Sequence, residues 1–290
     1  MLKYRLKIFF DLIKIKITIA VAFTTAVGYF LAADKLSFGI WAPIMGIFLL
    51  ASGASALNEY QERKIDGLMH RTKDRPLPAA KIQTKTAILI IIVLVVVGIF
   101  VLYIGTNLPA ILLGIFALFW YNGIYTPLKR KTAFAAIPGA VIGAIPPMVG
   151  WVAGGGYVFD PKIILIASFF FIWQVPHFWL LLLLSGEDYE RAGLPSLQKI
   201  FSITQISRIT FVWILTTGIT SLIIVNFGAV EFLFVKIGLV ILAVGLLWQA
   251  VKVLHVQDNL LPFKHAFISI NIFALLVIVF LSIDKLINVL

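Results

Sequence analysis

The sequence predicts an all-α polytopic membrane protein, and three observations lead to that fold class. Hydrophobic residues make up 61% of the 290 positions, charged residues only 13%, and the mean hydropathy is +1.04. Apolar runs long enough to cross roughly 30 Å of hydrocarbon recur along the whole chain. Strand-like alternation is absent, and backbone groups in lipid must be paired within the protein, so each run should be a helix.

We expect nine transmembrane helices within a single domain that covers residues 1–290. The first apolar run follows a basic stretch, as a signal peptide would, but eight more runs follow it and no convincing cleavage site ends it, so we expect it to be retained. The expected spans are 15–33, 39–57, 86–104, 108–125, 134–153, 163–184, 208–226, 232–250 and 266–283.

The basic residues predict the orientation of the chain. The net charge is +11, yet the Lys and Arg residues alternate between loops instead of forming one basic surface, so we expect no nucleic-acid partner. Placing the N-terminus in the cytoplasm puts all but four of them on the cytoplasmic side, as the positive-inside rule requires. The four on the outside are Lys35, Lys162, Lys236 and Lys285.

Two of the predicted inside loops, 58–85 and 185–207, carry far more polar residues than orientation alone requires. The outside connections are short and plain. Because the chain contains no cysteine, thiolate nucleophiles and Cys-ligated metal sites are excluded. We therefore expect the chemistry to lie at the cytoplasmic ends of the helices.

The first polar loop opens with three oxygen-bearing side chains at regular spacing. Asn58, Glu62 and Asp66 stand at i, i+4 and i+8, so on a helix they share one face. Oxygen ligands without His or Cys suit a hard cation such as Mg²⁺. Arg71 and Arg75 follow, and their guanidinium groups suit diphosphate oxygens. The plainer alternative is a helix end carrying ordinary charge pairs.

The residues of this loop resemble a known motif. The run NEYQERKID, followed by RTKDRPLP, is similar to the first aspartate-rich motif of the UbiA superfamily of intramembrane prenyltransferases. The resemblance covers nearly the whole chain and implies a UbiA-type bundle of nine helices. It also implies that Mg²⁺, held by Asn58, Glu62 and Asp66, promotes ionisation of an isoprenoid diphosphate, with Arg71 and Arg75 on the diphosphate.

A second stretch, YTPLKRKT at 125–132, is similar to another element of that superfamily. The resemblance places Tyr125 and Lys129 near the diphosphate. The alternative is that Lys129 and its basic neighbours serve only to orient the chain in the membrane.

Two further stretches, WQVPHFW at 173–179 and EDYERAGLP at 187–195, resemble the haem-modifying branch of the superfamily. Most other branches carry a second DxxxD motif here, whereas this chain has Ala192 four residues after Asp188. The branch implies farnesyl diphosphate as donor and haem B as acceptor. It also implies Asp188 as a further catalytic group and Mg²⁺ ligand, with substrate contacts from Trp173, Gln174, His177 and Tyr189.

Several alternatives remain open from the sequence. His177 could ligate haem iron, handle protons or simply pack in the bundle. The acceptor could instead be a quinone precursor, and a membrane transporter is a rival from another class. We expect the chain to be embedded in lipid in a bacterial cytoplasmic (inner) membrane. Haem A synthase or a terminal-oxidase assembly would then be a further partner.

Overall fold

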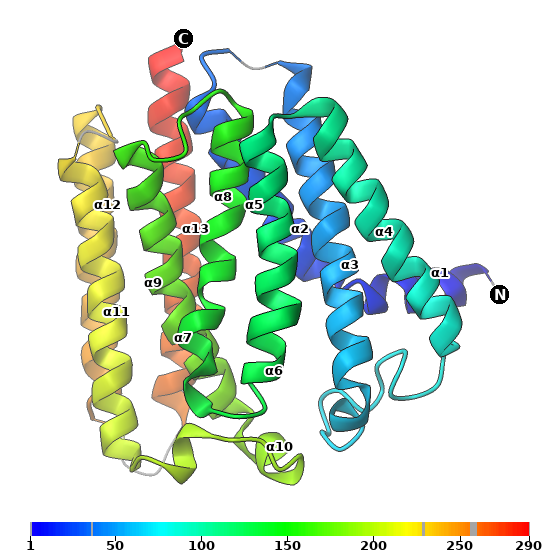
Figure 1. Cartoon of the computed structure of the whole chain (residues 1–290). Coiled ribbons are helices and arrows are strands. Elements are labelled where there is room, and N and C mark those ends of the chain that lie inside the picture. Colours follow the sequence, from blue (N-terminus) through cyan, green and yellow to red (C-terminus); the bar gives the residue numbers. More distant parts are fainter. Residues whose placement is uncertain (1, 36, 228–229, 256–259, 290) are drawn as a thin grey trace.

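The computed structural model describes residues 2–35, 37–227, 230–255 and 260–289, and within them the chain is an all-α bundle (Figure 1). In this described part, nine helices are long and apolar enough to cross a membrane, which confirms the predicted fold class. The protein is therefore an integral, multi-pass membrane protein.

The spanning helices follow the predicted order. One span is built from α5, a π-helical segment η2 and α6, and another from the short 3-10 segment η3 with α7 and α8. A third span begins with the 3-10 segment η1 Phe38–Ile40 and continues as α3, and the other spans are single helices. Their bounds are α2 Ile15–Ala32, α3 Trp41–Asp66, α4 Thr84–Gly105, α5 Leu108–Phe119, η2 Trp120–Tyr125, α6 Thr126–Leu128, η3 Ala133–Ala135, α7 Ala136–Gly139, α8 Val141–Ala153, α9 Pro161–Leu184, α11 Ile203–Asn226, α12 Leu233–Val253 and α13 Leu261–Val289.

The predicted end of the second span was wrong. The span predicted at 39–57 continues as α3 to Asp66, so the first third of the predicted loop 58–85 is helix. The extension is stable because its polar side chains are buried against other elements and not left in water. Two helices outside the spans were not foreseen, α1 Leu2–Leu12 before the first span and the short α10 Gly186–Arg191 after α9.

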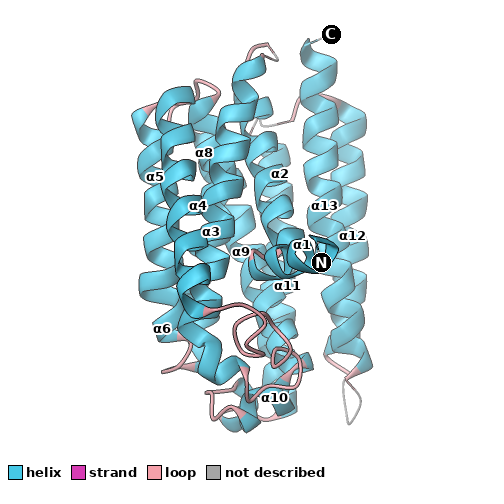
Figure 2. Cartoon of the chain, turned by 90° about the vertical axis from the view of Figure 1, so that its right-hand side faces the viewer, coloured by secondary structure: helices cyan, strands magenta, loops and turns pink. Residues whose placement is uncertain are grey.

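The polar loops gather at one end of the bundle. The loop after α3 lies at the same end as α10, while the C-terminal end of α13 lies at the opposite end (Figure 1, Figure 2). This arrangement confirms that loops 58–85 and 185–207 share one side. Helix α1 runs across the bundle axis, beside the spans (Figure 1).

Glycines allow α2 and α8 to approach at backbone distance. A methyl group added at Gly28 would overlap the carbonyl of Pro147, and one added at Gly150 would overlap the carbonyl of Thr25. Small residues at helix contacts are the usual means of close packing in lipid, where the hydrophobic effect does not drive helices together. The α2–α8 contact therefore depends on the absence of a side chain at these positions.

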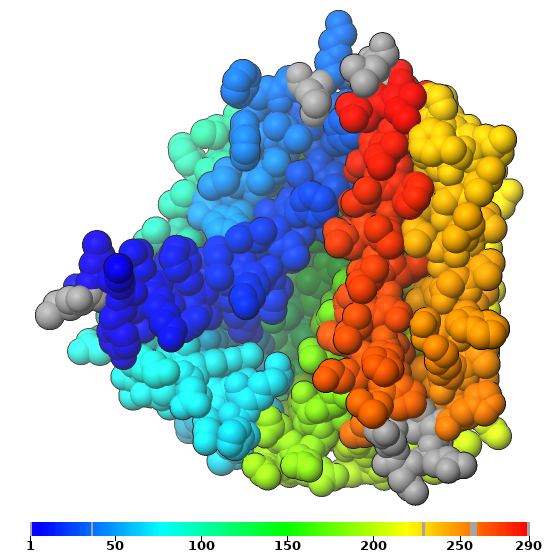
Figure 3. Space-filling view, turned by 180° about the vertical axis from the view of Figure 1, so that it is seen from behind, coloured from blue at the N-terminus to red at the C-terminus, as the bar shows by residue number. Residues whose placement is uncertain are grey.

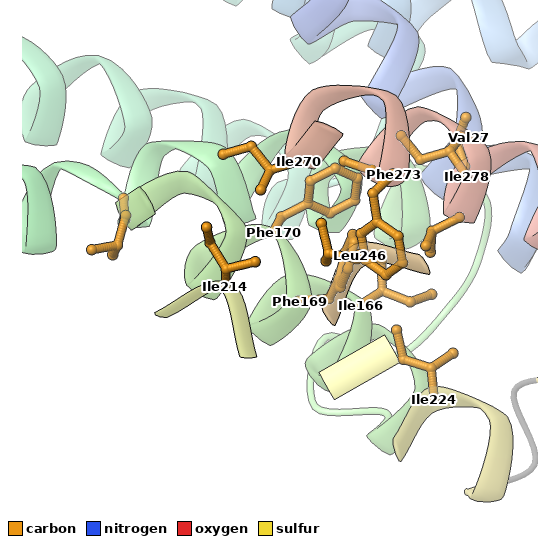
Figure 4. Close-up of a cluster of buried hydrophobic side chains, with 14 of the residues drawn as sticks. Val27, Ile166, Phe169, Phe170, Ile214, Ile224, Leu246, Ile270, Phe273 and Ile278 are labelled. Atoms are coloured by element: carbon orange, nitrogen blue, oxygen red, sulfur yellow. The ribbon is translucent and has the colours of Figure 1, made fainter. Parts of the chain in front are cut away.

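The main apolar core lies where α9, α11, α12 and α13 meet (Figure 4). Phe169 and Phe170 of α9 form an edge-to-face pair, and Phe169 also contacts Phe273 of α13. Ile214 and Leu246 complete the packing from α11 and α12. These contacts fix α9 and α13 against each other.

The space-filling view shows a recess between α2, in blue, and α13, in orange to red (Figure 3). Green atoms from the middle of the chain form its floor. The recess opens sideways, where lipid would surround the bundle. It is thus a lateral opening toward the bundle interior.

The orientation stays a prediction, and cysteine labelling can test it because the chain has no native cysteine. We expect Glu187→Cys, whose parent side chain is 91% exposed, to react with an impermeant maleimide only after the cells are opened. Tyr157→Cys, at the opposite end and 68% exposed, is the matched control and should react in intact cells. Labelling of the Glu187→Cys variant in intact cells would reverse the assigned orientation.

Candidate active site

The site is built on the C-terminal end of α3, which is the predicted cytoplasmic end. Asn58, Glu62 and Asp66 are all buried on one face, as their spacing predicted. Asn58 Nδ2 donates to Glu62 Oε2 at 3.1 Å and to Thr126 Oγ1 at 3.1 Å. The third oxygen-bearing group, Asp66, lies one turn further on. Three oxygen groups are thus held in a row by the helix and by its neighbour α6.

Each of these three groups meets a different cation. Lys14 Nζ donates to Asn58 Oδ1 at 2.8 Å. Lys129 Nζ lies 2.8 Å from Glu62 Oε1 and 2.9 Å from Oε2, and Arg75 Nη1 lies 2.8 Å from Asp66 Oδ2. The cations come from three separate parts of the chain. The arrangement concentrates positive charge in front of two buried carboxylates.

Lys14 was missed as a site residue, because the sequence interpretation counted it only among the basic residues that orient the chain. It stands between α1 and α2 with φ 52°, a left-handed conformation that ends one helix and redirects the chain into the next. Burial, reinforced by the charge of Arg75, lowers the pKa of Lys14 to about 8. The signal available in the sequence was its place directly before the first span, at the predicted cytoplasmic end.

The loop after α3 is fixed by hydrogen bonds to that helix. Glu59, fully buried, accepts from Leu77 N at 2.9 Å through Oε1. Thr72 Oγ1 donates to the backbone carbonyl of Asp66 at 2.8 Å. These bonds fold the loop back over the helix end. They explain how Arg75, nine positions after Asp66, reaches the carboxylate of that residue.

Asp188 ties the second polar loop to the first. Its carboxylate accepts from the backbone N–H of His70 at 2.7 Å and of Arg71 at 3.0 Å. The hydrogen bonds from Arg71 N–H and His70 N–H hold the pKa of Asp188 below its ordinary value. Asp188 does not line the pocket described below. Its predicted role as a metal ligand stays a prediction.

A π-helical turn shapes the opposite wall. In η2, the N–H and the hydroxyl of Thr126 both donate to the carbonyl of Tyr121, five residues back. Such turns are rare and occur frequently at functional sites. Tyr121 and Tyr125 stack with ring centroids 5.8 Å apart, and Tyr125 stacks on Phe178 of α9 at 5.6 Å with an interplanar angle of 6°. Three aromatic rings therefore form one wall.

These groups enclose one pocket, which unites eight of the twelve predicted site residues. The four that do not line it are Trp173, Gln174, His177 and Asp188. The residues that sequence reasoning missed include Lys14 and the apolar wall contributed by α9. The lining consists of Lys14, Asn58, Glu62, Asp66, Met69, Arg71, Arg75, Tyr121, Tyr125, Lys129, Phe178, Leu181, Leu182 and Tyr189.

Three of the residues outside the pocket belong to the WQVPHFW stretch, deeper along α9. Trp173 Nε1 donates to the carbonyl of Ile270 at 2.9 Å, and His177 Nδ1 lies 2.8 Å from Asn271 Oδ1. Both partners are on α13. Gln174 instead lies against Gly143 of α8. Gln174 and His177, which share one helix face by spacing, thus contact different neighbouring helices.

The donor set fits a hard cation, although no group of three or more His, Cys, Asp or Glu side chains comes together in the described part of the chain. The amide of Asn58 completes the set of oxygen ligands, because Glu62 and Asp66 are the only carboxylates in the pocket lining. Asp66 Oδ1 is buried without a hydrogen-bond partner among the described residues. A buried carboxylate oxygen without a partner is a suitable ligand position for Mg²⁺.

Comparison with known families agrees with this site. Residues 21–279 match the model of the UbiA prenyltransferase family, so the chain belongs to that family. It is a prenyltransferase, which leaves the transporter alternative without support.

Two relatives with the same name indicate which branch of the family this chain resembles. The chain is 34% identical to protoheme IX farnesyltransferase of Nitratidesulfovibrio vulgaris (strain Hildenborough) over 86% of this chain and 90% of that protein. It is 45% identical to the protein of the same name from Geobacter sulfurreducens, over 58% of this chain and 62% of that protein. The Geobacter match thus spans under two thirds of that relative's length.

Solved structures share the fold. A digeranylgeranylglyceryl phosphate synthase superimposes with a TM-score of 0.79 at 15% identity, covering 97% of this chain and 98% of that one. A UbiA homolog from Archaeoglobus fulgidus bound to GPP and Mg²⁺ gives 0.68 at 15% identity, covering 93% and 99%. At such low identity the likeness establishes the fold alone.

Proposed function

We propose that this enzyme transfers a farnesyl group from farnesyl diphosphate to a vinyl group of haem B and forms haem O. The observation that carries the prenyl-transfer half is the pocket in which three oxygen groups and three cations meet beside an aromatic wall. The haem half is supported by the relatives named protoheme IX farnesyltransferase and by the WQVPHFW stretch.

Asn58, Glu62 and Asp66 would hold Mg²⁺ in this site. When bound, the metal ion neutralises charge on the departing diphosphate. We expect the ion to lie on the face of α3 that the pocket exposes. Because Mg²⁺ seldom relies on protein ligands alone, the pocket that presents Asn58, Glu62 and Asp66 would have to admit the diphosphate together with the ion. We place this enzyme in a bacterial inner membrane.

The cations of this chain bind the diphosphate directly. Lys14, Lys129 and Arg75 converge from three elements on the carboxylate row, and Arg71 also lines the pocket. Charge-assisted hydrogen bonds from such groups are roughly twice as strong as neutral ones. Because the donors are already in place, they stabilise charge as it develops on the leaving group.

The aromatic wall and the lateral recess serve the isoprenoid. The stacked rings of Tyr121, Tyr125 and Phe178 present π-faces beside the diphosphate pocket, and π-faces attract a cation. Leu181 and Leu182 continue the wall with apolar surface that excludes water. The recess between α2 and α13 opens toward lipid and gives a hydrophobic tail a route in (Figure 3).

The reaction needs no strong base in the acceptor site. The C–O bond of the allylic diphosphate breaks, and the vinyl π-electrons form the new C–C bond to the farnesyl carbon. Water then adds to the carbocation beside the porphyrin ring and releases one proton. The protein therefore has to align the vinyl group and admit a single water late in the reaction.

The decisive experiment incubates the purified protein in lipid nanodiscs with labelled farnesyl diphosphate, Mg²⁺ and either haem B or 4-hydroxybenzoate. We expect labelled haem O from the first acceptor and no product from the second. Prenylation of 4-hydroxybenzoate with haem ignored would move the enzyme to the quinone branch of the family. If neither acceptor gave a product, the proposed farnesyl transfer to haem B would be contradicted.

Removing the charge of Lys14 should weaken diphosphate binding. A hydrogen bond to a charged group contributes about 1.5–3 kcal/mol, so we expect Lys14→Met to reduce farnesyl diphosphate affinity by about 10- to 100-fold. Lys16→Met is the matched control, since Lys16 lies two residues away, is exposed and does not line the pocket. Calorimetric titration with a non-hydrolysable analogue measures both. Equal losses in the two variants would show a general surface-charge effect instead.

A further inference from the structure

The contact between α9 and α13 holds two aromatic side chains in fixed positions outside the diphosphate pocket. Trp173 and His177, four residues apart on α9, bond to two consecutive residues of α13, Ile270 and Asn271. Both helices are anchored nearby by the phenylalanine cluster of the core (Figure 4). The imidazole of His177 is therefore attached to a rigid part of the bundle.

The hydrogen-bond network assigns the tautomer of this histidine. Asn271 Nδ2 donates to the carbonyl of Phe267, one turn back on α13, at 2.5 Å. This bond turns the amide so that Oδ1 faces His177 Nδ1, and a carbonyl oxygen can only accept. Nδ1 must therefore carry the proton. In the neutral ring, Nε2 then holds the free lone pair.

The lone pair on Nε2 is available. None of the described residues forms a hydrogen bond with Nε2. The atom is also not fully enclosed by protein, so a ligand can reach it. Three rings restrain the imidazole, with centroids 4.9 Å away for Trp173, 5.1 Å for Phe267 and 5.8 Å for Phe178. The ring thus has one nitrogen fixed by an amide and the other open.

We propose that His177 Nε2 ligates the iron of the haem acceptor and that Asn271 is the residue that positions it. The proposal rests on the proposed function and adds the mode of acceptor binding. A histidine whose other ring nitrogen donates to an oxygen is the usual form of a metal-ligating imidazole. Aromatic side chains around it suit a flat macrocycle.

The position of His177 also suits the reaction. Its neighbour Phe178 both contacts the imidazole and stacks on Tyr125 of the diphosphate pocket. A macrocycle bound through His177 is thus only one ring contact from the aromatic wall beside the reacting diphosphate. Iron ligation deeper in the bundle and bond formation at the pocket are compatible in one ternary complex.

Asn271→Leu removes the oxygen that fixes His177 and keeps the size of the side chain. Loss of such an outer partner costs about 10–100-fold in metal affinity, so we expect haem affinity to fall by that factor with farnesyl diphosphate affinity unchanged. Asn226→Leu is the matched control, because Asn226 makes the same bond to the carbonyl four residues back without a histidine partner. Haem absorbance titration of the whole protein in nanodiscs measures the effect.

Two further readouts separate positioning from a purely structural role. The Fe–His stretching band of the ferrous complex in resonance Raman should be absent in His177→Ala, move down in Asn271→Leu and move up in Asn271→Asp, because a stronger acceptor on Nδ1 makes Nε2 a stronger ligand. The double variant His177→Ala/Asn271→Leu should bind haem no worse than His177→Ala alone. Where Asn271→Leu fails to insert, the band of Asn271→Asp decides.

The outcomes distinguish a failure of the proposed function from a failure of iron ligation by His177. If wild-type protein neither binds nor farnesylates haem, the proposed function itself fails. If it farnesylates haem but the Raman band and haem affinity ignore Asn271, only the present inference is overturned. An Fe–His band that persists in His177→Ala would assign the iron to another ligand.

Discussion

We expect Asp66→Asn to lower turnover by about 10²–10³-fold, the range found when one preorganised electrostatic group is removed from a site. The substitution keeps the size of the side chain and removes a negative charge that faces both Arg75 and the free position at Oδ1. Steady-state farnesyl transfer in nanodiscs, titrated with Mg²⁺, measures the loss. The Mg²⁺ concentration for half-maximal rate should rise as well.

The control for Asp66 is Asp74→Asn, since Asp74 is an exposed carboxylate on the same loop that does not line the pocket. We expect wild-type turnover from this variant. EDTA should abolish the activity of the wild type, and excess Mg²⁺ should restore it. Full activity in EDTA would rule out a metal at the carboxylate row.

The second large effect concerns the α2–α8 contact. Alanine normally stabilises a helix by about 1 kcal/mol relative to glycine, yet we expect Gly150→Ala to destabilise the protein. Its methyl group would overlap the carbonyl of Thr25, and overpacking of this kind costs about 1–3 kcal/mol, or more where backbone must move. Thermal unfolding of purified protein in detergent should show a lower Tm for this variant.

Gly245→Ala is the matched control for Gly150→Ala. Gly245 also lies inside a spanning helix, α12, but apart from the adjacent backbone of that helix no atom of the described residues lies within 4 Å of an added methyl group. We expect its Tm to equal or exceed that of the wild type. If both variants lowered the Tm equally, the effect would belong to glycine in general and not to the close approach of α2 and α8.

Much of the fold could be predicted because hydrophobic length and loop charge act locally along the chain. The carboxylate row was also predictable, since Asn58, Glu62 and Asp66 lie on one helix and their spacing fixes their common face. Lys129 directly follows α6, in a different span, and only the resemblance of its neighbourhood to a known element predicted it as a site residue. The structure brings its Nζ to 2.8 Å from Glu62 Oε1, while its contact with the diphosphate stays a prediction.

The missed features depend on contacts between distant segments. Lys14 reaches Asn58 across 44 positions, and Asn271 meets His177 across 94. No periodicity within one helix specifies such a pair. The π-helical turn at Trp120–Tyr125 was missed for another reason, since a single inserted residue hardly changes an apolar pattern yet rotates every later side chain on that helix.

The hydrogen bonds between the two polar loops determine which of their positions tolerate substitution. The carboxylate of Asp188 is held by main-chain N–H groups of residues 70 and 71 and by neither of their side chains. Any residue other than proline supplies the same N–H group. The side chains at positions 70 and 71 can therefore be substituted, for instance to suit a different diphosphate, without loss of the hydrogen bonds that join the two loops. Position 188 has no such freedom, because both oxygens of its carboxylate are engaged.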